Sequence, residues 1–204
     1  MKLFVLGATG KTGMYVISQA LAKGHEVTAF VRSPEKITTT DARLTVKKGD
    51  PTRADELAAA LPGHHAVISV IGARSLGATT IHADAARATV DAMKRVGVRR
   101  MVALTSAFMF EQQILLGRIL RKTLFKHIVR DHEAMERAIV ESGLDWTLVR
   151  PPRLLAGEPT GHYQAVDERP GPRRTIRFSD VAHFMVAEAE RNEHVHQRVG
   201  LSNA

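Results

Sequence analysis

The sequence contains no cysteine among its 204 residues. Disulfide bonds, thiolate metal ligands and cysteine nucleophiles are therefore excluded. Tyrosine and tryptophan are scarce, with two copies and one copy, and no aromatic RNA-binding motif is present. No apolar run approaches the ~20 residues that a membrane-spanning helix needs. We therefore expect a soluble cytoplasmic protein without a membrane partner.

Positive charge exceeds negative charge, because 29 Lys and Arg residues face 21 Asp and Glu residues, for a formal net charge of +8. The basic residues are spread along the chain and are densest over residues 118–130. No helix-turn-helix or zinc-finger pattern accompanies them, so we expect no nucleic-acid partner. A site for a polyanionic small molecule and a basic surface without a specific partner both remain open. The histidines lack the spacing of metal ligands, so we expect no metal.

Short apolar segments alternate with helical periodicity through residue 150. Strands are predicted at residues 3–6, 26–31, 44–48, 66–71, 100–105 and 145–150, and helices at 12–23, 53–61, 79–96 and about 123–142. This alternation predicts an α/β fold of the Rossmann type, a doubly wound parallel sheet with the strand order 3-2-1-4-5-6. The length is sufficient for one core, so we expect a single domain over residues 1–204.

The pattern loosens after Pro151. Residues 151–175 are rich in Gly, Pro and Arg, and a last helix is predicted at about 180–191. We expect residues 151–178 to form a small C-terminal segment that covers the carboxyl ends of the strands and contacts the substrate.

Three glycines follow the first strand with the spacing G-x-x-G-x-x-G: Gly7, Gly10 and Gly13. In a dinucleotide site the first allows a tight turn, the second lets the backbone approach a pyrophosphate, and the third lets helix and strand pack closely. The next helix begins near Lys11 and Thr12, so its free amides and positive dipole end would face the phosphates. A glycine turn that binds nothing is the alternative.

The end of the second strand indicates which dinucleotide binds. NAD sites place an acidic residue there to hold the ribose 2′-hydroxyl, whereas this chain has Arg32. A guanidinium binds a 2′-phosphate with two parallel hydrogen bonds, and Lys36 would add charge, so the pattern favours NADPH. Asp50 follows the third strand, in position to meet the adenine amino group. A solvated arginine and an ordinary turn aspartate before proline are the alternatives.

The later strands should surround the nicotinamide, because ligands of open α/β sheets bind at the carboxyl ends of the strands. From these ends we predict cofactor contacts at Ile71, Gly72, Ala73, Arg74, Thr105 and Pro151, and substrate contacts at Ala107, Phe108, Pro152 and Arg153. Ser106 is a candidate to hold the carboxamide or to orient a substrate oxygen. Its alternative role is to cap the loop that follows.

No Tyr-x-x-x-Lys pair, the proton relay of tyrosine-dependent reductases, is present. Tyr15 and Tyr163 are followed four residues later by glutamine and aspartate. The helix after the fifth strand carries His132 instead, on one face with Ile128 and Met135. This histidine is either a hydrogen-bonded core residue or an imidazole that passes a proton near the crevice.

Taken together, these segments resemble the biliverdin-IXβ reductase/flavin reductase family of the NmrA-like atypical short-chain dehydrogenases/reductases. The matching segments are Gly7 to Gly13, Val31-Arg32-Ser33, Thr105 to Phe108, Asp131-His132, Pro151-Pro152 and Asp180 to Met185. The resemblance implies an NADPH-dependent reductase that transfers a hydride to FMN, riboflavin or biliverdin. It places Ser106 and His132 at the active site and Thr9, Lys11, Thr12 and Arg74 at the cofactor.

The chain departs from the mammalian type at Arg153, where that type has histidine, and this arginine would favour an anionic acceptor such as a flavin phosphate. A second class of function stays open, since NmrA-like proteins include redox sensors that bind NADP without turnover. A nucleotide-sugar isomerase or dehydratase is a third possibility, against which the missing Tyr-x-x-x-Lys pair counts. We expect a monomer or weak dimer.

Overall fold

A computed structural model describes residues 1–72, 79–110 and 125–204 of the chain. Its main sheet contains the six predicted strands in the predicted order, β3-β2-β1-β4-β5-β6, all parallel. Their bounds are β1 Lys2–Leu6, β2 Glu26–Val31, β3 Leu44–Lys48, β4 Ala66–Ser69, β5 Arg100–Leu104 and β6 Asp145–Arg150. The α/β Rossmann-type prediction is therefore confirmed.

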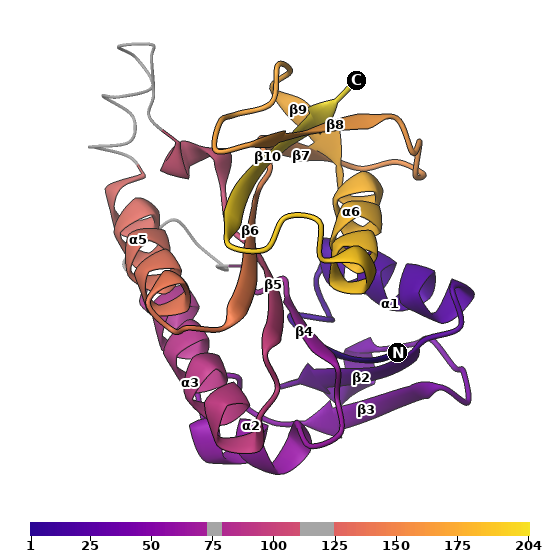
Figure 1. Ribbon diagram of the computed structural model, residues 1–204. Helices are drawn as coiled ribbons and strands as arrows, with labels where there is room; N and C mark the ends of the chain where they lie inside the picture. The colour runs from indigo at the N-terminus through magenta and orange to yellow at the C-terminus, as the bar shows by residue number, and fades with distance from the viewer. Residues whose placement is uncertain (73–78, 111–124) are drawn as a thin grey trace.

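The two faces of the sheet are covered by different helices (Figure 1). One face packs against α1 (Lys11–Ala22) and α6 (Phe178–Arg191), and the other against α2 (Ala54–Ala60), α3 (Ile81–Val96) and α5 (Lys126–Val140). Side chains alternate between the faces of a strand. In β1, Leu3 belongs to the core beneath α1 and α6, whereas Phe4 belongs to the core beneath α2, α3 and α5.

The segment after β6 contains more regular structure than its composition indicates. β10 (Gln197–Asn203) joins β6 in parallel, β8 (Tyr163–Asp167) pairs with β10 in antiparallel orientation, and β7 (Arg153–Leu155) and β9 (Thr175–Arg177) form a separate parallel pair. Close packing explains a glycine in β10, because a Cβ on Gly200 would lie 2.1 Å from the carbonyl oxygen of Arg169.

The buried face of α1 differs in part from the face that simple helical spacing indicates. The periodicity places Met14 on the same face as Ile17 and Leu21, but Met14 is 45% exposed. Val16 and Ala20 complete the buried stripe instead. The buried face of α1 is therefore centred on Val16, Ile17, Ala20 and Leu21. No helix in the described part of the chain has the length and apolar composition of a membrane span.

Candidate functional site at the carboxyl ends of the strands

The loop between β1 and α1 has glycines that are required for different reasons. Gly7 has a left-handed backbone (φ +79°), and a Cβ there would lie 2.6 Å from the backbone of Val70. A Cβ on Gly13 would lie 2.4 Å from the carbonyl oxygen of Gly7. Gly10, by contrast, has an ordinary φ of −83° and is exposed, and a Cβ there would meet only the Gly7 oxygen at 3.3 Å. Its missing side chain therefore leaves the backbone open toward the outside.

The N-terminus of α1 is not neutralised by the protein. Gly10 is the N-cap residue, no side chain provides a capping hydrogen bond, and the first turn contains no acidic residue. The first amides of a helix lack partners inside the helix and carry the positive end of its dipole. This end of α1 therefore has the properties of an anion-binding site.

A cavity of about 440 Å³ opens beside this helix end. Its described lining comes from the glycine loop, from the ends of β2, β4 and β5, from the turns after β2 and β3, and from the starts of α3 and α6 and the strand β7. These residues are Gly7, Thr9, Gly10, Lys11, Thr12, Phe30, Val31, Arg32, Ser33, Lys36, Pro51, Val70, Ile71, Gly72, Ile81, Leu104, Leu154 and Phe178. The described lining includes three cations, Lys11, Arg32 and Lys36, and no carboxylate.

Arg32 and Asp50 lie on the same side of the cavity but differ in whether their side chains already have partners in the protein. Arg32 is exposed, and no described carboxylate lies within ion-pair distance of it. Asp50 lies beside Pro51, outside the lining, and its Oδ1 accepts hydrogen bonds from the amide (2.9 Å) and hydroxyl (2.8 Å) of Thr52. The Thr52 amide and hydroxyl, aided by the charges of Arg32 and Arg53, hold the pKa of Asp50 below its ordinary value. The turn role of Asp50 is thus visible in the structure.

The far end of the cavity is apolar and was not predicted from the sequence. It is lined by Ile81, Leu104, Leu154 and Phe178. The Nζ of Lys11 lies 5.4 Å from the centre of the Phe178 ring, so this aromatic side chain borders the glycine loop. These four residues come from four elements, and only the tertiary structure brings them together. A weak signal existed in Phe178, which stands two residues before the segment Asp180 to Met185.

The carboxyl ends of β5 and β6 are joined, since Ala107 donates its amide to the carbonyl of Pro151 (2.9 Å). Ser106 caps the short helix η2 (Ala107–Met109), because its Oγ accepts a hydrogen bond from the amide of Phe108 (3.3 Å). The Thr105 hydroxyl is buried and has no hydrogen-bond partner among the described residues. A buried polar atom without a partner is typical of a position where a ligand or water binds.

Several predicted contacts lie outside the cavity lining. Gly13 packs behind the loop, and Thr105, Ser106 and Pro151 lie at the strand ends without lining it. The predicted substrate contacts Ala107, Phe108, Pro152 and Arg153 also fall outside the described lining, although Arg153 precedes Leu154, which does line it. Ala73 and Arg74 lie outside the described residues.

His132 occupies the interface between α5 and α3. Its side chain is buried, and its ring centre lies 4.3 Å from that of His82. Burial, together with the neighbouring His82, lowers the pKa of His132 to about 4. The adjacent Asp131 is buried too and accepts hydrogen bonds from the amides of His82 (3.1 Å) and Ala83 (2.9 Å). This geometry matches the core-histidine interpretation, with the Asp131-His132 pair holding the start of α3.

Comparison with known proteins agrees with this arrangement. An uncharacterized chloroplastic protein of Arabidopsis thaliana is 31% identical over 92% of this chain and 69% of its own length. A solved structure from Streptococcus pneumoniae, described as a candidate NADH-flavin reductase, is 25% identical, with a TM-score of 0.79 and full coverage of both chains.

A short-chain dehydrogenase/reductase from Veillonella parvula, solved in complex with NADP, has a TM-score of 0.82 over 99% of this chain and 94% of its own. At 17% identity it shows the fold alone. The family model for NAD(P)H-binding proteins matches residues 7–192, from the first loop glycine to the end of α6. With its Rossmann strand order and glycine loop, this chain belongs to the NAD(P)H-binding family.

Proposed function

We propose that this protein is an NADPH-dependent reductase that transfers a hydride to a flavin, such as FMN or riboflavin, or to a similar conjugated acceptor such as biliverdin. The observation that carries the proposal is the polarity of the cavity. One side, at the end of β2, presents Arg32 and Lys36, and the other, at the end of β5, presents apolar side chains that include Leu104, while Lys11 lies 5.4 Å from the centre of the Phe178 ring. A ligand that fits both sides has several phosphates and a flat, less polar ring.

The residues present fit NADPH. The uncapped start of α1 and the open backbone at Gly10 suit a diphosphate. Arg32 and Lys36 lie beyond the end of β2, where NAD-binding folds hold the adenosine ribose. The described lining contains no carboxylate that would repel a 2′-phosphate, and the guanidinium would bind it.

The bound nicotinamide supplies the hydride when reduced. The chain supplies binding, orientation and exclusion of water, which is the usual division of labour in cofactor enzymes. Ile81, Leu104, Leu154 and Phe178 would pack against the rings at the apolar end. A conjugated acceptor carries its own electron sink, so a protein acid is less necessary. His132 does not line the described cavity, and its pKa of about 4 leaves the buried imidazole neutral near pH 7.

The comparisons support the reaction class without defining the acceptor. The Streptococcus pneumoniae structure is described as an NADH-flavin reductase candidate, and it aligns along the whole chain. Under the proposal, Ser106 and Arg153 remain the contacts for the acceptor. Arg153 is exposed and adjoins the lining residue Leu154, so it is placed to meet a charged group of an anionic acceptor.

The choice of dinucleotide is tested by replacing Arg32 with alanine. We expect the dissociation constant for NADPH to rise about 10- to 100-fold, since charge-assisted hydrogen bonds to the 2′-phosphate are lost. The constant for NADH should change little. Arg43→Ala is the matched control, because Arg43 is an exposed arginine paired with Asp41. Titrations of both nucleotides by calorimetry decide the question, and tighter binding of NADH than NADPH by the wild type would refute it.

Turnover is tested separately by anaerobic mixing of the NADPH complex with FMN, riboflavin or biliverdin, followed through the nicotinamide absorbance. We expect oxidation in a single turnover with at least one flavin. Tight NADP binding without oxidation by any acceptor would identify the redox-sensor alternative instead.

A further inference from the structure

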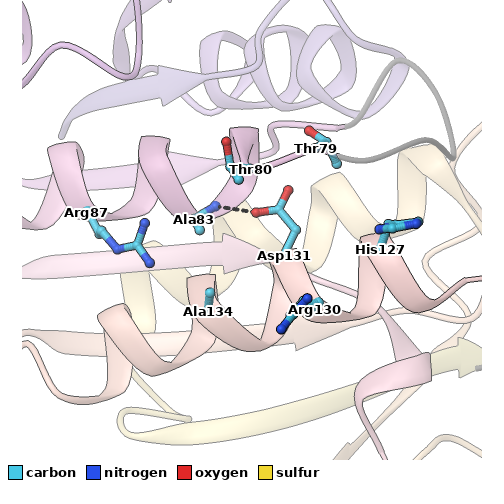
Figure 2. A pocket seen from close by; sticks show the side chains of 8 residues that line it. All are labelled: Thr79, Thr80, Ala83, Arg87, His127, Arg130, Asp131 and Ala134. Atoms are coloured by element: carbon cyan, nitrogen blue, oxygen red, sulfur yellow. Dashed lines mark hydrogen bonds between the residues drawn. The ribbon is translucent and has the colours of Figure 1, made fainter. Parts of the chain in front are cut away.

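A second cavity, of about 390 Å³, lies between the first half of α3 and the first half of α5 (Figure 2). Its basic lining residues are Arg87 on α3 and His127 and Arg130 on α5. Two hydroxyl residues, Thr79 and Thr80, line the end of the cavity at the start of α3. The remaining lining residues are Ala83, Ala134 and Asp131.

The carboxylate of Asp131 is already committed to the protein. Its Oδ1 accepts the amide of Ala83 (2.9 Å), the bond drawn in Figure 2, and its Oδ2 lies 3.1 Å from the amide nitrogen and 2.8 Å from the Nδ1 of His82. Both oxygens therefore face donors at the start of α3. Asp131 therefore forms its ion pair and hydrogen bonds at the start of α3, and it forms no ion pair with Arg87 or Arg130.

Those cations have little other compensation. Arg130 forms no ion pair with any described residue, and Arg87 pairs with Asp84 at 3.1 Å on a surface where both side chains are about half exposed (59% and 46%). An exposed pair of this kind contributes little free energy, so it competes weakly with a bound anion. Two guanidinium groups thus stand on opposite walls of one cavity.

The two threonines add donors of the right kind. Thr79 Oγ1 accepts the amide of Ile81 (3.2 Å), so its hydroxyl proton remains free to donate. Thr80 occupies the N-cap position of α3, and its side chain makes no capping hydrogen bond. The amides of the first turn are used by Thr79 and Asp131, so the site rests on side-chain donors and not on the helix end alone.

We propose that this second cavity binds a small oxyanion, a phosphate or carboxylate compound with at least two negative charges, separately from the nucleotide. Planar guanidinium groups recognise such oxygens with paired hydrogen bonds. The two sites meet at the first turn of α3, since Ile81 lines the nucleotide cavity while Thr79 and Thr80 line the second one. This second site stands whether or not the first cavity binds NADPH.

The test is an NMR titration of the nitrogen-15-labelled full chain with inorganic phosphate and, in parallel, with citrate. The amides of Thr80, Ala83 and Arg130 report on the second cavity, and those of Gly10 and Thr12 report on the nucleotide cavity. We expect saturable shifts of the first set with a dissociation constant on the order of 1 mM. Added NADPH should abolish the phosphate response of Gly10 and Thr12. The response of Thr80, Ala83 and Arg130 should remain. A stronger response to phosphate or to citrate distinguishes the two sources of the oxyanion.

The matched variants are the double substitution Arg87→Gln/Arg130→Gln and the control Arg137→Gln, an exposed arginine further along α5 that does not line the cavity. The double variant should bind at least about tenfold more weakly, and the control should stay within about twofold of the wild type. Equal titration of both variants would overturn the proposal. A response confined to the amides of Gly10 and Thr12 would also overturn it. The same holds if the wild type self-associates and Arg130→Gln abolishes this association, because the basic residues would then serve an interface between copies of the chain.

Discussion

Gly10 and Gly13 belong to the same loop, yet they lack a side chain for different physical reasons. At Gly13 the reason is internal packing, because a Cβ would collide with the Gly7 carbonyl and with Ala8. At Gly10 the backbone is relaxed and exposed, so the protein itself would tolerate a methyl group. The proposed diphosphate is what would require the open backbone there. The missing side chain is therefore needed for folding at Gly13 and, under the proposal, for nucleotide binding at Gly10.

Alanine substitutions test this separation. Gly13→Ala should lower the free energy of unfolding by about 1–3 kcal/mol, the usual cost of overpacking. Gly10→Ala should stay within about 0.5–1 kcal/mol of the wild type but weaken NADPH binding, because its Cβ would stand where a phosphate approaches. Denaturant unfolding and nucleotide titration of both variants provide the measurement. Undiminished NADPH affinity in Gly10→Ala would show that the diphosphate lies elsewhere.

His132 illustrates how burial changes the chemistry of a residue. Its pKa is about 4 in the folded protein, compared with an ordinary value of 6.5. The unfolded chain therefore takes up a proton between these two values that the folded chain does not accept. The contribution of neutral His132 to the free energy of unfolding is therefore present in full above about pH 6.5 and is lost as the pH falls toward 4.

We predict that unfolding experiments between pH 7 and pH 4 show a loss on the order of 3 kcal/mol that depends on His132. His132→Phe should flatten this part of the profile. His127→Asn, an exposed histidine on the same helix, should leave it unchanged. If the slope survives in His132→Phe, another group is responsible.

Turnover with flavin should fall less than about tenfold in His132→Ala, below the contribution of a general acid.

At the scale of elements, the start of α3 is held by a residue from another helix. Asp131 of α5 accepts the amides of His82 and Ala83, which is the work that an N-cap side chain normally does within its own helix. The first turn of α3 also contributes Ile81 to the nucleotide cavity. This clamp, the contact of Asp131 with the amides of His82 and Ala83, therefore connects the packing of α5 against α3 to the wall of the nucleotide cavity.

Removing this clamp should be measurable as lost stability. Asp131→Ala should lower the free energy of unfolding by about 2 kcal/mol or more, since a cap is lost and two buried amides and an imidazole lose their partner. Asp84→Ala, which removes a half-exposed acid in the first turn of α3, should cost less than about 1 kcal/mol. Thermal and denaturant unfolding of both variants test this, and equal effects would contradict it.

Across the whole molecule, a buried ionic network ties the later part of the chain to the middle of the sheet. Glu188 of α6 accepts hydrogen bonds from the guanidinium of Arg100 in β5 (2.6 Å) and the hydroxyl of Thr147 in β6 (3.1 Å). It also accepts the amide of His194, just before β10 (2.9 Å). Since Arg100 and Glu188 are buried, each depends on the other for compensation.

Glu188→Ala should destabilise the protein by about 3–5 kcal/mol, because it leaves the Arg100 charge buried without a partner. Glu193→Ala is the control, since Glu193 is exposed and lies 3.9 Å from Arg191, and its effect should stay within about 0.5 kcal/mol. Urea unfolding of the two variants provides the comparison. A loss below about 1 kcal/mol in Glu188→Ala would mean that the network contributes little net stability.

Local patterns determined much of this protein. Alternating apolar segments, the glycine spacing and Arg32 at the end of the second strand predicted the sheet order and the side of the cavity that carries positive charge. These features are visible in the sequence because each depends on neighbours within a few turns or within one strand-turn-helix unit.

Only the tertiary structure decided the apolar end of the site, the strands β7 to β10 and the place of His132. Leu104, Leu154 and Phe178 converge from distant parts of the chain, and β10 pairs with strands that come more than thirty residues earlier. Whether the imidazole of His132 lies in the core or near the crevice depends on which helix packs against it, and in the structure it lies 4.3 Å from the ring of His82 in α3. Burial and strand pairing are properties of distant contacts, which no local pattern contains.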